Sequence, residues 1–370
     1  MEILIQVLIM SRIALFVLGT ILHIPQQANA QETEKSDRLQ QLEQRVKELE
    51  QQAKAAQTSP SMQSSLRNSH FSLYGSLRPT LEYQDKADDV WDIGDALSRL
   101  GVKADTEFTP NWHAIAQGEW KIRLDDNGRF GEARLAFAGI GSPFGQITFG
   151  RQRPVQYTLV AEYIDIFNNA NSPFGYNQES PFFVNNALIY ELKLKPVTVM
   201  ASAIFDGNSG GSGADTINVG AGFDKNGLHL GAAYLQQDVY ANANRTGKEQ
   251  LTGAVISYEF SSGIYAAVGY QAKDYEFETA VNRTGSTFDS ALAIPFANAY
   301  KLKLGYFWFK DGIEDTSSQD YDGYNLTLEW QIAANVRTHL EYLQQNNDQR
   351  EDDTIIALGI RYDFDLNWEF

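Results

Sequence analysis

The chain has 370 residues, of which 43% are hydrophobic, 21% are charged and none is cysteine, so its length allows one large β-barrel or two ordinary domains. The absence of cysteine excludes disulfide scaffolds, thiolate metal sites and cysteine nucleophiles. A formal net charge of −17 would repel phosphate backbones, which excludes nucleic acid as a partner.

Residues 1–30 are predicted to be a secretory signal peptide. The apolar run Ile13–Leu22 is short for a membrane span, and Ala28-Asn29-Ala30 is a small-x-small cleavage pattern, so we expect cleavage after Ala30. Met1 and Met10 are both candidate start residues, and Met10 would give the usual short basic opening through Arg12. The alternative is an uncleaved membrane anchor, which is disfavoured because polar residues follow the run at once.

Residues 31–58 are predicted to form a periplasmic coiled-coil helix, and residues 59–68, which include Pro60, a linker. Apolar residues recur at alternating steps of three and four over about two and a half heptads. An isolated helix pair of this length is marginal, so we expect it to assemble only where another part of the protein, such as a trimeric barrel, already joins the chains. A single solvated spacer helix is the alternative. The seam residues are Leu39, Leu42, Val46, Leu49, Ala53 and Ala56.

From residue 69 to residue 370 the apolar residues alternate with polar ones, as in β-strands. Between Ile356 and Phe370 the even positions are apolar, whereas the odd positions from Arg361 to Glu369 are polar. A soluble sandwich could use such an apolar row as a core, so one strand does not decide the matter. Charge gathers on the opposite face of several strands, as at the odd positions of 99–107, and this favours a membrane barrel with a polar lumen.

The segment count predicts an all-β fold: a transmembrane antiparallel β-barrel of about 16 strands, which is wide enough for an aqueous channel. Short turns such as Thr109–Asn111 and Lys225–Gly227 are expected to face the periplasm. Longer polar stretches at 206–214, 238–249, 274–288 and 311–323 are expected to face outside.

Four segments resemble strands of the trimeric general diffusion porins of Gram-negative bacteria, in that family's order and spacing. They are FSLYGSLRPTLEYQ (71–84), SRLGVKADT (98–106), RLAFAGIGSPFGQITFGRQ (134–152) and DDTIIALGIRYDF (352–364). The resemblance implies an outer-membrane homotrimer in which the third loop, about 152–182 here, folds into the barrel and narrows it. It also implies loop carboxylates that face arginines on the wall. Opposite charges on the two sides of a narrow passage set up a transverse electric field, which favours small polar solutes.

The resemblance suggests where the pore constriction lies. Asp165 occupies an acidic loop position, Arg99 and Arg134 fall where the family keeps pore arginines, and Arg78 has the inward parity of the first strand. The family's loop glutamate is missing from Ser172–Tyr176, and Asn168–Asn171 is an insertion. The expected constriction residues, with Glu162 and Glu179 as candidate replacements and Asn186 at an arginine position, are Arg78, Arg99, Arg134, Glu162, Asp165, Glu179 and Asn186.

The predicted function is passive diffusion of small hydrophilic solutes and ions through an outer-membrane porin, with a cation preference inferred from the overall acidity. We expect no catalytic residues and no cofactor. We also expect no metal, since the five histidines make no metal-ligand spacing. Expected partners are outer-membrane lipid and lipopolysaccharide, with peptidoglycan a further candidate for the N-terminal helix. A channel selective for anions or oligosaccharides is the first alternative, although neither an inward ladder of Arg and Lys nor a slide of aromatics is clear. A barrel enzyme or adhesin is the second alternative. An enzyme would need a catalytic cluster on the outer wall or rim and an adhesin a large passenger or loop domain, and the chain shows room for neither.

Overall fold

The computed structural model describes residues 44, 47, 68–85, 90–126, 128–168, 181–207, 210–211, 213–241, 244–278 and 280–370. Of the predicted signal peptide, coiled coil and linker, the described residues are Gln44 and Lys47, both helical, and Asn68. The six seam residues Leu39, Leu42, Val46, Leu49, Ala53 and Ala56 lie outside the described residues. Within the described part of the chain, no helix is both long and apolar enough to cross a membrane.

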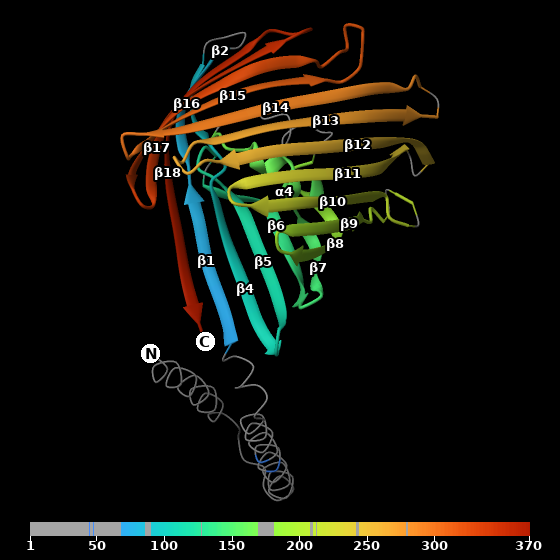
Figure 1. Ribbon diagram of the computed structural model, residues 1–370, viewed down its shortest axis with the longest axis vertical. Coiled ribbons are helices and arrows are strands. Elements are labelled where there is room, and N and C mark those ends of the chain that lie inside the picture. Colours follow the sequence, from blue (N-terminus) through green and yellow to red (C-terminus); the bar gives the residue numbers. More distant parts are fainter. Residues whose placement is uncertain are drawn as a thin grey trace, which may run out of the picture. The chain divides into compact units, whose positions relative to one another are not determined.

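Residues Ser64–Phe370 form one unit that consists almost entirely of antiparallel strands (Figure 1). The strands are β1 (Ser69–Leu77), β2 (Pro79–Asp85), β3 (Val90–Asp95), β4 (Arg99–Thr109), β5 (Trp112–Arg123), β6 (Arg129–Ser142), β7 (Gly145–Gln152), β8 (Val184–Leu194), β9 (Val197–Ile204), β10 (Thr216–Lys225), β11 (Leu228–Ala241), β12 (Asn244–Glu259), β13 (Tyr265–Phe277), β14 (Arg283–Phe296), β15 (Tyr300–Lys310), β16 (Tyr321–Ala333), β17 (Val336–Asn347) and β18 (Asp353–Glu369). A short helix α4 (Val155–Leu159) and a 3-10 turn η2 (Ala161–Tyr163) follow β7.

The sheet closes on itself, because the last strand pairs with the first. β18 pairs with β17 on one side and with both β1 and β2 on the other. β1 and β2 are two parts of one strand, interrupted at Arg78, and β3 and β4 are likewise two parts of its neighbour. The 18 segments therefore make a closed barrel of 16 strands, which confirms the predicted fold.

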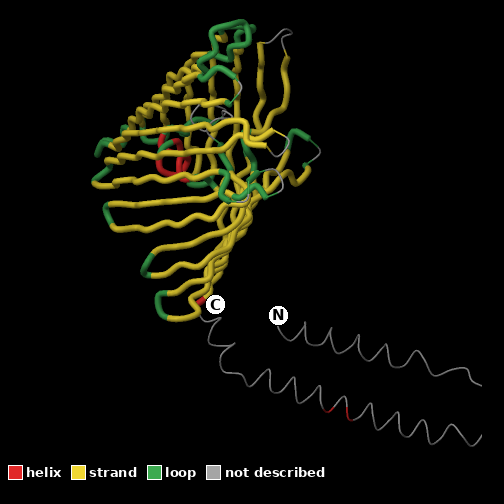
Figure 2. Tube along the Cα trace, turned by 90° about the vertical axis from the view of Figure 1, so that its right-hand side faces the viewer, coloured by secondary structure: helices red, strands yellow, loops and turns green. Residues whose placement is uncertain are grey.

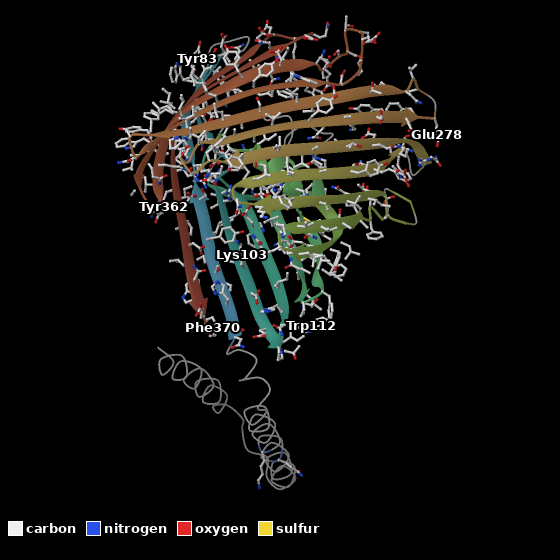
Figure 3. The ribbon with its side chains drawn as sticks, in the orientation of Figure 1. Tyr83, Lys103, Trp112, Glu278, Tyr362 and Phe370 are labelled. Atoms are coloured by element: carbon white, nitrogen blue, oxygen red, sulfur yellow. The ribbon has the colours of Figure 1, made fainter. Side chains whose placement is uncertain are left out.

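The two ends of the barrel differ in the length of their connections. Short turns join the strands at the end that carries Ser69 and Phe370; the turn at Asn226–Gly227 has the positive φ of a tight hairpin, as its sequence predicts. Figure 3 places Trp112 and Phe370 at this end. The opposite end carries the longer connections. The expected loops at 238–249 and 274–288 are wrong in extent, because β11 to β14 continue through most of these residues and pair there.

The outer face of the barrel is apolar. On β18 the even positions predicted to face lipid are exposed, for example Leu358 (54%) and Ile360 (50%). The same holds for outward residues such as Ile256 on β12 and Leu340 on β17. An exposed apolar band of this kind matches the hydrocarbon layer of a membrane, where a closed barrel leaves no backbone group unpaired.

The inner face divides into two halves, which we name by their chemistry. Over β8 to β14 it carries a cluster of small and apolar residues, with Ala187, Met200, Ala233, Val255 and Ala291 all buried, among polar side chains such as Asn218 and Gln271; we call this the apolar half. The loop that follows β7 packs against this apolar half through Val155, Leu159, Val160, Ala161 and Ile164. Over β15 to β18 and β1 to β6 the inner face is charged, and this is the charged half. The charge that the sequence places on the inward face of several strands, as on β4, belongs to this charged half.

Glycines let the loop approach the apolar half closely. A Cβ added at Gly231 would lie 1.8 Å from the carbonyl oxygen of Leu159, and one added at Gly220 would lie 2.9 Å from the Leu159 side chain. Only glycine fits such a contact without moving the backbone. The loop therefore runs inside the barrel, as predicted, with α4 against β10 and β11 and enclosed by the strands (Figures 1 and 2).

Candidate functional site

The first strand pair is broken at the level where the loop crosses the lumen. Arg78 separates β1 from β2, and its backbone N–H donates to Ser98 Oγ at 2.7 Å. Opposite it, Ala96–Ser98 separates β3 from β4, and Leu97 has a φ of 69°, which is uncommon for a residue other than glycine. Such local distortions interrupt the regular alternation and re-aim side chains. Here they place the Arg78 side chain inside the barrel, where it is 7% exposed.

Arg99 and Arg134 share one carboxylate. Arg134 Nε donates to Glu119 Oε1 at 2.6 Å, and Arg99 Nε lies 3.7 Å from Glu119 Oε2. Arg134 stands at a register irregularity between β5 and β6, where Glu119 pairs with Leu135 and Trp120 with Ala133. A β-bulge at this point turns the guanidinium toward the lumen.

The neighbouring sector of the wall repeats this pattern. Glu329 on β16 lies 2.9 Å from Lys303 Nζ and 3.6 Å from Arg337 Nη1. Asp363 on β18 lies 2.8 Å from Arg361 Nε and 4.0 Å from Arg337 Nη2. Each of these three wall carboxylates thus lies between two cations, and five cations share them: Arg99, Arg134, Lys303, Arg337 and Arg361.

Arg153 begins the loop and packs on aromatic rings. Its guanidinium lies 3.9 Å from the Tyr157 ring centroid and 4.2 Å from that of Phe182. Its Nη1 is buried and has no hydrogen-bond partner. Cation–π contacts hold the planar group in place without neutralising its charge.

Asp165 lies on the loop opposite these cations, and the Tyr157 hydroxyl donates to its Oδ2 at 2.7 Å. Burial raises the pKa of Asp165, although the Tyr157 hydrogen bond and the nearby Arg153 favour its charged form. Glu162, one turn earlier, is exposed to the lumen. The loop therefore supplies two carboxyl groups to the passage, and Asp165 has a weakened tendency to ionise.

Four inward side chains, one on each of four alternate strands, contact the loop backbone in succession. His229 on β11 contacts the Leu159 carbonyl through Nε2 at 3.0 Å, and the Tyr265 hydroxyl on β13 donates to the Tyr163 carbonyl. Lys303 on β15 donates to the Ile166 carbonyl at 2.8 Å, and the Asn168 N–H donates to Glu341 Oε2 on β17 at 3.0 Å. This row of contacts carries the loop across the lumen from β11 to β17.

Wall and loop together enclose a cavity of about 320 Å³ in the lumen, which we call the constriction. Its described lining includes two carboxyl groups, Glu162 and Asp165. The lining also includes seven cationic side chains: Arg78, Arg99, Arg134, Arg153, Lys303, Arg337 and Arg361.

The structure brings together five of the seven residues expected at the constriction: Arg78, Arg99, Arg134, Glu162 and Asp165. Glu179 lies outside the described residues, as does the turn Ser172–Tyr176. Asn186 requires a correction. It is exposed on β8 with a φ of 50°, and it does not line the constriction, because the inward positions of that strand are Ala187 and Ile189.

Sequence reasoning missed Arg153, Lys303 and Arg337, and it did not assign Arg361 to the constriction. The inward parity of β18 did mark Arg361, and the same count on β15 and β17 would have marked Lys303 and Arg337. Parity alone gives no level along the barrel axis, so it could not show that these residues meet the loop. Among the described residues, no group of His, Asp or Glu side chains has the arrangement of a metal site.

A comparison with protein families matches residues 52–350 to the family described as Gram-negative porin. The chain is 23% identical over 282 residues to the porin-like protein L of Photobacterium profundum, covering 72% of this chain and 80% of that protein.

Solved structures with the same fold include several outer-membrane proteins. A loop L8 deletion mutant of OmpT from Vibrio cholerae has a TM-score of 0.66 at 19% identity, over 80% of this chain and 100% of that one. An anion-selective porin from Comamonas acidovorans has a TM-score of 0.66 at 17% identity, with the same coverage. The trimer form of in-vitro folded OmpT from Vibrio cholerae has a TM-score of 0.64 at 17% identity, again over 80% and 100% of the two chains.

Proposed function

The chain belongs to the Gram-negative porin family, and on this premise we propose that its barrel is a water-filled channel for the passive diffusion of small hydrophilic solutes and ions across the outer membrane. The observation that carries the proposal is the constriction: a polar, charged cavity inside a closed barrel whose outer face is apolar. A polar solute that passes the constriction replaces contacts with water by contacts with charged side chains. An apolar solute gains no such contacts.

The mechanism requires no covalent step. Cations on the charged half of the wall face Glu162 and Asp165 on the loop, and opposite charges across a narrow passage set up a transverse field that orients water and dipolar solutes. The solute's own gradient drives the flux. Family and fold point to a channel rather than to a barrel enzyme, and an assay of the purified protein for lipase and protease activity addresses that alternative directly.

The channel function is tested with purified protein in planar lipid bilayers. We expect stepwise, ohmic increases in current, and liposomes that carry the protein should swell in small sugars and not in large ones. A protein that inserts into the bilayer without any conductance steps would contradict the proposal.

We also propose that the protein is a homotrimer in the outer membrane, in contact with lipid and lipopolysaccharide. One of the solved OmpT structures is described as a trimer form, which supports the proposal through the shared fold. The expected result is an SDS-resistant band at three times the monomer mass that collapses on boiling. A single monomer band under mild detergent at all temperatures would count against a trimer.

For the N-terminal region we propose a signal peptide at residues 1–30, a periplasmic coiled-coil helix at 31–58 and a linker at 59–68, ahead of the barrel at 69–370. N-terminal sequencing of the mature protein should begin at Gln31. Sedimentation with purified peptidoglycan, with and without residues 31–58, tests whether this helix binds the cell wall.

The cation preference that the overall acidity predicts stays a prediction. The local charge of the constriction points the other way, because cationic side chains outnumber carboxyl groups in its described lining.

A further inference from the structure

We propose that the constriction is a binding site for small oxyanions, meaning carboxylate or phosphate groups, and that it makes the channel prefer anions to cations. This inference rests on the proposed channel function and adds a substrate class to it. It depends on which charges a solute in the passage can reach, and not on the net charge of the chain.

The surface that a solute meets in the constriction is cationic. Seven Lys and Arg side chains and two carboxyl groups belong to its described lining. Of the three wall carboxylates, Glu119 and Glu329 are 6% and 4% exposed, and Asp363 is ion-paired with Arg361 and Arg337; all three lie outside that lining. Rings of Arg and Lys at a narrow point are the arrangement that selects anions.

Two guanidinium groups in this lining have no carboxylate within ion-pair distance among the described residues. Arg78 donates through Nε to Ser76 Oγ at 2.7 Å, and Arg153 stacks on Tyr157 and Phe182 with its Nη1 unpartnered. A buried charge without an opposite charge is costly unless something else compensates it. A planar guanidinium fork is well matched to the two oxygens of a carboxylate or phosphate group.

Acidic residues elsewhere in the chain contribute little to the electrostatic potential in the constriction. Many acidic residues lie in the connections at the two ends of the barrel, for example Asp215, Asp315 and Asp320 at the end with the longer loops. Mobile ions screen charges over a Debye length of about 10 Å at 0.1 M salt, and the constriction is bounded by its own fixed charges. Local charge therefore decides the selectivity of the passage, whereas net charge does not.

The test is a reversal-potential measurement on the full-length protein in a planar bilayer under a KCl gradient. We expect the sign that indicates a higher permeability for Cl⁻ than for K⁺. One unit charge roughly 6 Å from a passing ion, screened by 0.1 M salt, changes the local concentrations of Cl⁻ and K⁺ by about twofold each, in opposite directions. We therefore expect Arg78→Gln and Arg153→Gln each to lower the Cl⁻ to K⁺ permeability ratio by roughly threefold.

Lys103→Gln is the matched control. Lys103 lies on β4 with the same inward parity as Arg99, is exposed and does not line the constriction (Figure 3). The Lys103→Gln substitution removes the same unit charge from the lumen, and the Cl⁻ to K⁺ permeability ratio should stay close to that of the unmodified protein. Arg153 lies on the loop and not on a strand, so its variant serves as the test if Arg78→Gln fails to fold.

Inorganic phosphate probes the binding site itself. At constant KCl, added phosphate should reduce the single-channel current in a saturable way, and Arg153→Gln should weaken this block. Conductance steps with a K⁺-preferring reversal potential, or a current that phosphate does not change, would overturn the inference while leaving the channel function intact. The absence of any steps would instead count against the channel function.

Discussion

The two halves of the inner wall obey the same alternation of side chains and yet face different surroundings. On the apolar half the inward residues are mostly alanine, glycine and aliphatic, and the loop after β7 covers them. On the charged half the inward residues include Arg, Lys, Glu and Asp, and cations among them line the constriction. The barrel thus contains a small hydrophobic core on one side and a polar passage on the other.

The difference shows why the loop lies where it does. Covering the charged half would bury guanidinium and carboxylate groups away from water, which is costly unless every one of them is paired. Leaving the apolar half open would expose aliphatic surface to the lumen. The packing of Val155, Leu159 and Ile164 therefore selects the side of the lumen that stays open.

The largest effect is expected from a substitution that displaces the loop from the apolar half and so removes the difference between the two halves. Gly231→Val places side-chain atoms where the Leu159 carbonyl lies, since even a Cβ would come within 1.8 Å of that oxygen. We expect the loop to shift and the single-channel conductance to rise roughly threefold as the passage widens. Bilayer recordings check this.

Gly222→Ala is the control for that variant. A Cβ at Gly222 would lie 3.2 Å from Leu159 Cδ2, the far end of a flexible side chain, which can move aside. Its conductance should stay close to that of the unmodified protein. An unchanged conductance for a well-folded Gly231→Val protein would show that the loop does not set the width of the passage.

Removing a wall carboxylate should increase the positive charge of the charged half. Glu119→Gln leaves Arg99 and Arg134 without their shared partner, so their charge acts fully on the passage. We expect the Cl⁻ to K⁺ permeability ratio to rise roughly twofold. Glu107→Gln, near the end of β4, removes the same charge outside the constriction and should have no such effect. A fall in the ratio for Glu119→Gln would contradict this view of the wall.

The smallest expected effect concerns pH. Burial raises the pKa of Asp165 above the ordinary value of about 3.9, so the group takes up its proton at a higher pH than an exposed aspartate. As the pH falls through that raised pKa, the loop loses negative charge beside Arg153, Arg78 and Arg134. The anion preference should therefore increase on acidification by less than about twofold. Asp165→Asn should remove most of this change, and a pH response of the same size in Asp165→Asn would assign it to another group.

Much of this fold could be predicted from sequence, because the alternation that defines a membrane strand is local. The parity of Arg99 and Glu119 gives their inward direction without any knowledge of the fold. The missing information concerns depth and partners. Whether Ala233 faces water or the loop depends on how β11 meets Leu159, which lies some seventy residues earlier in the sequence.

The constriction was predictable only in part for a related reason. Arg78, Arg99 and Arg134 lie in segments that resemble the family, whereas Lys303 and Arg337 lie in a stretch that matches only in pattern. Asn186 was misplaced because it lies at an irregularity in the pairing of β7 with β8, between Gly150 and Gln152, where the alternation of inward and outward side chains is interrupted.

Cysteine accessibility tests the division of the inner wall most directly, because the chain has no native cysteine to react. We would compare Arg361→Cys on the charged half with Ala233→Cys beneath the loop, each treated with a charged methanethiosulfonate reagent during bilayer recording. The division predicts that current through Arg361→Cys channels changes within the first exposure and that Ala233→Cys channels stay unmodified. Equal reaction rates at the two positions would contradict it.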